Sequence, residues 1–186
     1  MQYSTLALVV GVPLTIAALS VAALPASSQT AIGWTKPKPI VAWTGSYSAI
    51  EQRHYRRITN AEDWATLWTE HQSDRIERDS YGEPVVPTID FETNMVLAIF
   101  RGKAWNVRSE SLVDFSELEN NIRIRFDART YQTDGPAEDK DYTSAYGIWV
   151  LPRSTKSITL IENVQGLIGQ PPKWKTQHTF DPLREN

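Results

Sequence analysis

Residues 88–102 read TIDFETNMVLAIFRG, and this stretch decides the fold class. A polar, turn-forming lead-in gives way to six consecutive apolar residues, 95–100, and Arg101-Gly102 ends the run. Six apolar residues between turn signals are too few for a typical helix, and they are typical of a strand that is buried on both faces. The sequence therefore predicts a domain that is organised around one central β-strand.

One amphipathic helix is expected before this strand. Thr59 followed by Glu62 matches a capping box, in which each side chain satisfies a backbone N–H of the first turn. Large side chains then recur at helical spacing, at Trp64, Leu67, Trp68 and His71. We expect a helix that is capped by Thr59, ends near Asp74 and packs this face on the sheet.

Further strands are expected on both sides of the central strand. Residues 121–131 alternate strictly between apolar and charged side chains, which indicates an antiparallel strand with one wet face. Other strand patterns cover residues 46–58, 109–115, 145–151 and 157–162, and residues 163–180 are expected to form a loop or a short helix. The predicted fold class is α+β: a single domain with a mostly antiparallel sheet of five to six strands and one N-terminal amphipathic helix packed on it.

The N-terminus predicts the compartment. Residues 6–26 are apolar and uncharged, and small residues follow them, which resembles a secretory signal peptide over residues 1–28. An uncleaved membrane anchor is the alternative, but Pro13 and Pro25 favour the cleaved signal. We expect an exported protein, in the periplasm, at the cell surface or outside the cell, that contacts a membrane only if this segment stays uncleaved.

The composition bears on the class of partner, and the sequence patterns predict where the folded domain begins and ends. The chain has 186 residues, no Cys and a net charge of −3, so the sequence favours neither a nucleic-acid partner nor disulfide bonds. Pro37 and Pro39 alternate with lysines in residues 29–45, which predicts an extended linker. Residues 46–180 are then the folded domain with its C-terminal extension, and residues 181–186 are a tail.

The sequence contains no catalytic pattern that we can identify. His54, His71 and His178 lack the spacing of a metal site, and His71 is interpreted as a packing residue on the helix. There is no thiol, no G-x-S-x-G elbow and no S-x-x-K motif. The acidic residues of 133–143 lack the spacing of a calcium loop and are interpreted as a solvated hairpin loop. We expect no catalytic residues, no metal, no cofactor and no enzymatic activity.

The aromatic residues outside the core patterns are the better candidates for function. Trp105 and Asn106 lie in a polar loop, and Trp174 follows two prolines and lies between two lysines. An exposed Trp offers a flat apolar surface to a sugar ring or to a protein partner. These three residues form the candidate binding surface. The alternative is that each Trp covers an open end of the sheet.

Three segments together resemble the PrcB C-terminal domain family. They are the helix pattern W-x-x-L-W at 64–68, the strand motif IDFETNMVLAIFRGK at 89–103, and the late segment TSAYGIWVLPRS at 143–154. The resemblance covers about residues 55–153. PrcB is an accessory subunit of a bacterial surface protease complex, so the resemblance implies a non-catalytic domain with a protein partner. Family members often follow the strand with a Gly-Gly-Tyr loop, whereas this chain has KAWNVR at 103–108.

Three functions follow and remain open at this point. The first is a non-catalytic, exported protein-interaction domain with a protein partner in the cell envelope. The second is a carbohydrate-binding module of the cell envelope. The third is a hydrolase of unrecognised type, which would require a cleft with at least two convergent titratable groups.

Overall fold

The computed structural model describes residues 33–132, 142–167 and 169–184. The predicted signal peptide, the start of the predicted linker, most of the acidic loop and the last two residues lie outside these ranges. Within the described ranges no helix combines the length and the apolar character needed to cross a membrane.

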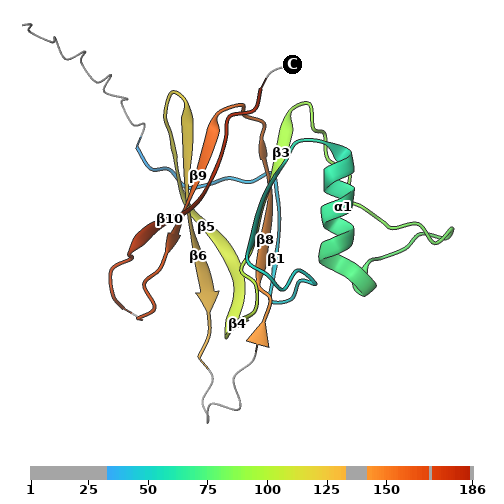
Figure 1. Cartoon of the computed structure of the whole chain (residues 1–186), viewed down its shortest axis with the longest axis horizontal. Coiled ribbons are helices and arrows are strands. Elements are labelled where there is room, and N and C mark those ends of the chain that lie inside the picture. The colour runs from blue at the N-terminus through green and yellow to red at the C-terminus, as the bar shows by residue number, and fades with distance from the viewer. Residues whose placement is uncertain (1–32, 133–141, 168, 185–186) are drawn as a thin grey trace, which may run out of the picture.

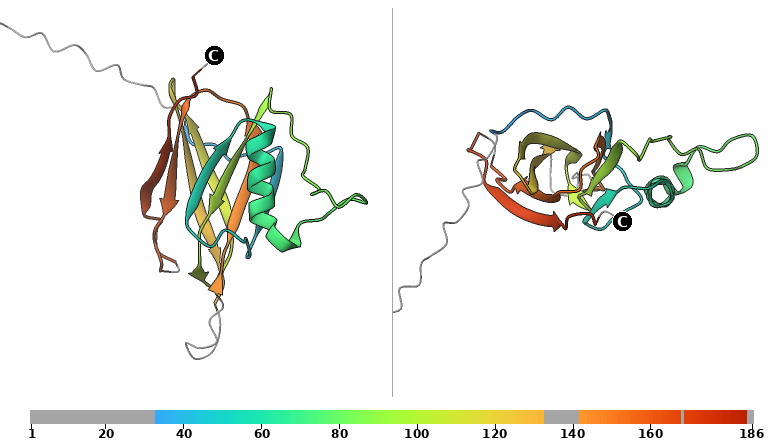
Figure 2. Two further views of the ribbon diagram at one scale, coloured as in Figure 1. Left: turned by 45° about the vertical axis from the view of Figure 1, so that its right-hand side comes forward. Right: turned by 90° about the horizontal axis from the view of Figure 1, so that it is seen from above.

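The described part of the chain folds into three layers, which are one helix and two four-stranded sheets (Figure 1). The first sheet is antiparallel throughout, with the order β1 (Val41–Gly45), β8 (Tyr146–Pro152), β3 (Asn94–Phe100) and β2 (His54–Ile58). Seen from above in Figure 2, helix α1 (Ala61–Gln72) lies on one side of this sheet and the second sheet lies on the other.

The second sheet contains one parallel pair. Its order is β10 (Trp174–Phe180), β9 (Ser157–Asn163), β6 (Asn121–Thr130) and β5 (Val107–Glu117). Only β9 and β6 run parallel, and the other neighbours are antiparallel. A short ribbon of β4 (Ala104–Trp105) and β7 (Tyr142–Thr143) lies at the lower end of Figure 1. The mostly antiparallel architecture with one helix agrees with the predicted fold class, but the single sheet of five to six strands is wrong.

Strand β3 explains why two sheets are needed. Its apolar run is buried on both faces, as the sequence predicted. One face, with Val96, Ala98 and Phe100, packs under the helix, and the other, with Met95, Leu97 and Ile99, packs against the second sheet. Because a helix covers only one face of a sheet, the other face requires a second layer.

Helix α1 begins one residue later than predicted. Asn60, not Thr59, is the N-cap, and its Oδ1 accepts the backbone N–H of Asp63 at 2.8 Å. Asn at this position satisfies the same donor that a Ser or Thr cap would. The helix ends at Gln72, and a 3₁₀ turn, Ser73–Arg75, follows it to the predicted end near Asp74. The predicted inner face is confirmed, because Trp64, Leu67, Trp68 and His71 are all buried.

His71 is a packing residue, as the sequence indicated. Its ring lies 4.2 Å from that of Tyr146 and 5.7 Å from that of Phe100, measured between centroids. Its Nδ1 lies 2.9 Å from the Ser48 hydroxyl. Burial, and secondarily the charge of Arg75, lowers the pKa of His71 to about 4, so the ring is neutral at physiological pH.

Both predictions for the ends of the domain need correction. Residues 41–45, expected in the linker, form β1, because the edge of β8 offers backbone groups that an extended segment can pair with. Residues 174–180, expected in a loop or short helix, form β10. A bulge between Thr176 and His178 shifts the alternation of this strand, so its sequence lacks a clean period of two.

Candidate functional site

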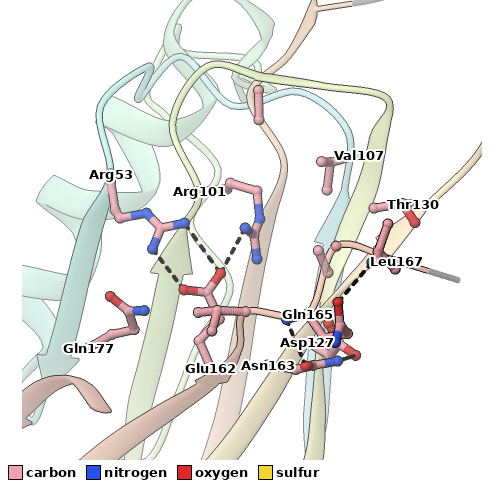
Figure 3. A pocket seen from close by; sticks show the side chains of 14 residues that line it. Arg53, Arg101, Val107, Asp127, Thr130, Glu162, Asn163, Gln165, Leu167 and Gln177 are labelled. Atoms are coloured by element: carbon pink, nitrogen blue, oxygen red, sulfur yellow. Dashed lines mark hydrogen bonds and ion pairs between the residues drawn. The ribbon is translucent and has the colours of Figure 1, made fainter. Parts of the chain in front are cut away.

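The candidate site is a pocket of about 530 Å³ at the lower end of the two sheets (Figure 3). It opens between the end of β6, the loop after β9 and the segment that joins β3 to β5. Its walls combine a few apolar side chains with charged and amide side chains. The polar members are Arg53, Arg101, Asp127, Thr130, Glu162, Asn163, Gln165 and Gln177.

The strand pairing brings the two arginines together. Arg53 directly precedes β2 and Arg101 directly follows β3. Because these strands are antiparallel neighbours, both residues lie at the same end of the sheet. Gly102 allows the chain to turn close to Arg53 at this end. Its φ is +77°, and a Cβ there would lie 2.7 Å from the backbone nitrogen of Arg53. Glycine is therefore the residue that this approach requires.

Four charged side chains form one continuous network between the sheets. Arg53 donates to both oxygens of Glu162, from Nη1 at 2.9 Å and from Nη2 at 3.3 Å. Arg101 donates from Nη1 to Glu162 at 2.8 Å and from Nη2 to Glu110 at 3.0 Å, and its Nε also pairs with Glu110. The Glu110 side chain is fully buried, while that of Arg53 is 41% exposed. The network therefore runs from the interior to solvent.

The two carboxylates have opposite pKa shifts. Burial raises the pKa of Glu110, and the hydrogen bonds and charge of Arg101 offset this only in part. Burial would also raise the pKa of Glu162, but hydrogen bonds and charges from both Arg53 and Arg101 lower it below its usual range. Glu162 is therefore a fixed negative charge between two guanidinium groups, which suits it to positioning better than to proton donation.

The mouth of the pocket carries a carboxylate with no ion pair. Asp127 accepts a hydrogen bond from the Asn163 amide at 2.9 Å, and no salt bridge among the described residues includes it. The side-chain Oδ1 of Asn163 accepts the backbone N–H groups of Gln165 and Lys173, each at 3.0 Å, and so fixes the β9–β10 loop. This arrangement can bind a cationic or hydrogen-bond-donating group.

Trp105 lies beside the pocket on the β4–β7 ribbon. It is 46% exposed, and its ring centroid lies 3.5 Å from that of Tyr142. Asn106 has a positive φ of 51° and makes the turn from β4 into β5. Their neighbours Ala104 and Val107 line the pocket, whereas Trp105 and Asn106 do not.

Trp174 lies in a different environment. It is half-buried, and its ring lies 4.7 Å from the Arg125 guanidinium, which also lies 3.8 Å from the ring of Trp34. These stacked contacts are favourable cation–π interactions. The predicted binding surface is thus divided: Trp105 and Asn106 lie beside the pocket, and Trp174 packs on Arg125.

Sequence reasoning missed the charged network. A weak signal was present in β9, where Glu162 follows Ile158 and Leu160 at a spacing of two and so belongs to the inward face. A carboxylate at an inward position indicates a buried partner. The two arginines that pair with it flank two strands of the other sheet, and no local pattern reveals this pairing. Within the described ranges no group of three or more potential ligands could hold a metal ion.

Comparison of the chain with protein-family models, with curated proteins and with solved structures gives no match.

Proposed function

We propose that this protein is an exported, non-catalytic accessory domain that binds a protein partner of the cell envelope. The resemblance to the PrcB C-terminal domain family and the apolar N-terminus support this proposal. The observation that carries it is the lower end of the domain, where an exposed aromatic pair, Trp105 and Tyr142, lies beside a preformed pocket.

The aromatic pair is suited to an interface because its rings are already fixed. Trp and Tyr are the residue types that most often dominate binding energy, and rings held in place lose little conformational freedom when a partner binds. The pair is held by the β4–β7 ribbon, and Lys103 adds a cation 5.2 Å from the Tyr142 ring.

The pocket supplies specificity to the same surface. Asp127 at its mouth lacks an ionic partner among the described residues, so a basic side chain of the partner would gain a charge-assisted hydrogen bond there. We therefore expect the partner to present an apolar group to Trp105 and a Lys or Arg to Asp127.

The carbohydrate-binding alternative has one observation in its favour. The side chains of Asn163, Gln165 and Gln177 in the pocket are of the kind that bind sugar hydroxyls. Titration of Trp fluorescence with envelope glycans tests it, with the Trp105→Phe variant to assign the signal. A saturable change that depends on Trp105 would favour the glycan.

The hydrolase alternative requires a cleft with at least two titratable groups, and this pocket has two carboxylates, Glu162 and Asp127, among its lining residues. Both oxygens of Glu162 already accept hydrogen bonds from arginines, which favours a positioning role for this carboxylate. The absence of enzymatic activity stays a prediction.

Photo-crosslinking in cells that produce the protein naturally tests the proposal. A photoreactive phenylalanine replaces Trp105 in one variant and Tyr81 in the control. Tyr81 is 89% exposed and lies on the loop after α1, which projects away from the sheets (Figure 1). We expect a discrete protein adduct from position 105 only. Equal adducts from both positions, or none from 105, would contradict the proposed surface.

Binding to the partner identified in this way gives the quantitative test. Trp105→Ala should weaken binding at least tenfold, since truncation of a hot-spot aromatic costs about 2 kcal/mol or more. Tyr81→Ala should change the affinity less than twofold. Mass spectrometry of the mature chain tests export separately, and we expect Gln29 as its first residue.

A further inference from the structure

The second sheet has an outer face that points away from the first sheet. In β6, Ile122, Ile124 and Phe126 pack into the core between the sheets, so the residues that alternate with them lie on the outer face. These residues are Arg123, Arg125, Asp127 and Arg129. Three guanidinium groups and one carboxylate therefore share about 20 Å of one strand, at about 3.3 Å per residue.

The strand pairing places hydroxyl groups beside these arginines. Arg123 is paired with Thr159 of β9, and Thr159 is paired with Thr179 of β10. Residues that are paired across neighbouring strands point to the same side of a sheet, so both hydroxyl groups lie on the outer face. Thr176 lies on this face as well, because it is paired with the partner of Arg125. The face thus combines cations with groups that can donate and accept hydrogen bonds.

Trp34 adds a flat aromatic ring to the outer face. The segment before β1 follows the second sheet before it reaches the first (Figure 2), and Thr35 exchanges two backbone hydrogen bonds with Phe115 of β5, at 2.7 and 2.8 Å. This pairing places the Arg125 guanidinium 3.8 Å from the centroid of the Trp34 ring. Trp34 is nevertheless 38% exposed. The guanidinium holds the ring in place, and the exposed part of the ring is available to a ligand.

The outer face is positively charged, although the whole chain has a net charge of −3. Arg123 and Arg129 are exposed, and no salt bridge in the described part of the chain includes either of them. The carboxylate nearest to Trp34, that of Asp114, already lies 3.4 Å from the Lys36 ammonium and 4.0 Å from the Arg125 guanidinium. Two further exposed cations flank Trp174 in the sequence, Lys173 and Lys175. An anionic ligand therefore complements this face.

We propose that the outer face of the second sheet binds an acidic polysaccharide, with a sugar ring on Trp34 and sugar carboxylates at Arg123 and along β6. The arginines select the charge, and the aromatic ring together with the threonine hydroxyls selects the sugar. A single-stranded nucleic acid would require several aromatic rings in a row for its bases. Trp34 and Arg123 do not line the pocket at the lower end, so this proposal does not depend on the protein partner.

A length series of oligogalacturonates, which carry one carboxylate on each sugar ring, tests the proposal. Binding to the full protein is measured by isothermal titration calorimetry at several salt concentrations. We expect saturable binding that strengthens with length and weakens as salt is added, because exposed charges are screened. Two probes of similar length separate the contributions: a neutral maltodextrin has the sugar without the charge, and polyglutamate has the charge without the sugar. Each should bind about tenfold more weakly than the oligogalacturonate.

Variants with matched controls place the ligand on the outer face. Arg123→Gln should weaken binding of the oligogalacturonate about two- to fivefold, and Arg123→Lys should restore most of the affinity. Arg56→Gln is the control for charge, because Arg56 is exposed on β2 of the other sheet. Trp34→Ala should weaken binding about three- to tenfold, and thermal unfolding checks that this variant is folded. Tyr81→Ala, which removes an exposed ring from the loop after α1, should leave binding unchanged.

Three results would overturn the proposal. They are no binding of the longest oligogalacturonate at millimolar concentration, equal binding of polyglutamate, and equal weakening by Arg56→Gln and Arg123→Gln. A single-stranded oligonucleotide that binds more tightly than the oligogalacturonate would also overturn it and would identify the face as a nucleic-acid site. If Trp34→Ala does not fold, the Arg123 variants and the comparison with polyglutamate decide the question.

Discussion

The two ends of the paired sheets are closed in opposite ways. At the lower end, Arg53, Arg101, Glu110 and Glu162 join the sheets through an ion-pair network, and a polar pocket lies beside it. At the upper end the same sheets leave a depression of about 300 Å³ that has apolar side chains in its walls, among them Phe115 and Ile122. Every sandwich of two sheets has two such ends. Here one is closed by a buried ion-pair network, and the other by apolar side chains together with hydrogen bonds from Arg57 to the carbonyl oxygens of Lys156 and Asp181.

This difference has an energetic meaning. Buried charges are tolerated only when each has its partner, so the lower end depends on all four side chains together. The depression at the upper end leaves space beside Ile122, so a larger side chain is tolerated there more readily than in a filled core. We therefore expect the lower end to resist substitution and the upper end to tolerate it.

The largest effect is expected from Arg101→Met. This change removes the guanidinium that joins Glu110 to Glu162 and leaves the fully buried Glu110 without its partner. It should lower the free energy of unfolding by about 3–5 kcal/mol at pH 7, measured by urea denaturation. Arg129→Met on the exposed face of β6 is the control and should change stability by no more than about 0.5 kcal/mol. Equal effects of the two variants would show that the network does not hold the lower end together.

The next largest effect is the loss of stability in acid. We expect it to arise from His71 under the helix and not from either end of the sheets. The pKa of His71 is about 4 in the folded protein and about 6.5 in the unfolded chain. Between these values the unfolded state binds the proton and the folded state does not, so the free energy of unfolding falls as the pH falls from about 6.5 to 4. The loss should approach about 3 kcal/mol.

Urea denaturation across this pH range measures the effect, and His71→Phe provides the comparison. Phe keeps an aromatic ring against Tyr146 and Phe100 but does not titrate, so the slope between pH 6.5 and 4 should flatten. An unchanged slope in the variant would assign the acid sensitivity to groups other than His71. Glu162, whose pKa is lowered, would then lose stability only at more acidic pH.

The smallest effect is expected at the upper end. Ile122 lines the depression at the upper end, so Ile122→Phe adds volume where space is open and should raise the free energy of unfolding by about 0.5–1 kcal/mol. Ile148→Phe makes the same change under the helix, where the core is filled, and should lower it by about 1–3 kcal/mol. Thermal unfolding of the two variants measures both. Destabilisation by Ile122→Phe would show that the upper end is packed as tightly as the core.

The sequence predicted the elements whose signal is local. The apolar run of β3, the buried face of α1 and the alternation of β6 each depend on neighbouring residues, and the structure confirms all three. The helix cap was displaced by one residue because Thr59 and Asn60 can both serve as caps. The second sheet was missed because nothing local shows that Ser157–Asn163 pairs in parallel with Asn121–Thr130.

The candidate site was less predictable than the fold. Trp105 was predicted as a surface residue because a large aromatic residue in a polar loop is unusual, and the structure shows that it is exposed. Its role in binding stays a prediction. The network was not predicted, because its members lie in or next to four different strands of two sheets. Glu110 and Glu162 lie in β5 and β9, and Arg53 and Arg101 flank β2 and β3. The basic residues around Arg53 are typical of the solvated face of a strand. Only the folded structure shows that Arg53 pairs with the distant Glu162.

Strand β1 is made early in synthesis, but its partner β8 is made late, and this limits when the first sheet can form. Val41 pairs with Val150, and β6 finds its parallel neighbour only after β8 has been made. Neither sheet can be completed while the later strands are still being synthesised, and such distant pairings slow folding. A chain that stays open until its last strands emerge is compatible with transport across a membrane before folding, because the early part can pass through without unfolding first.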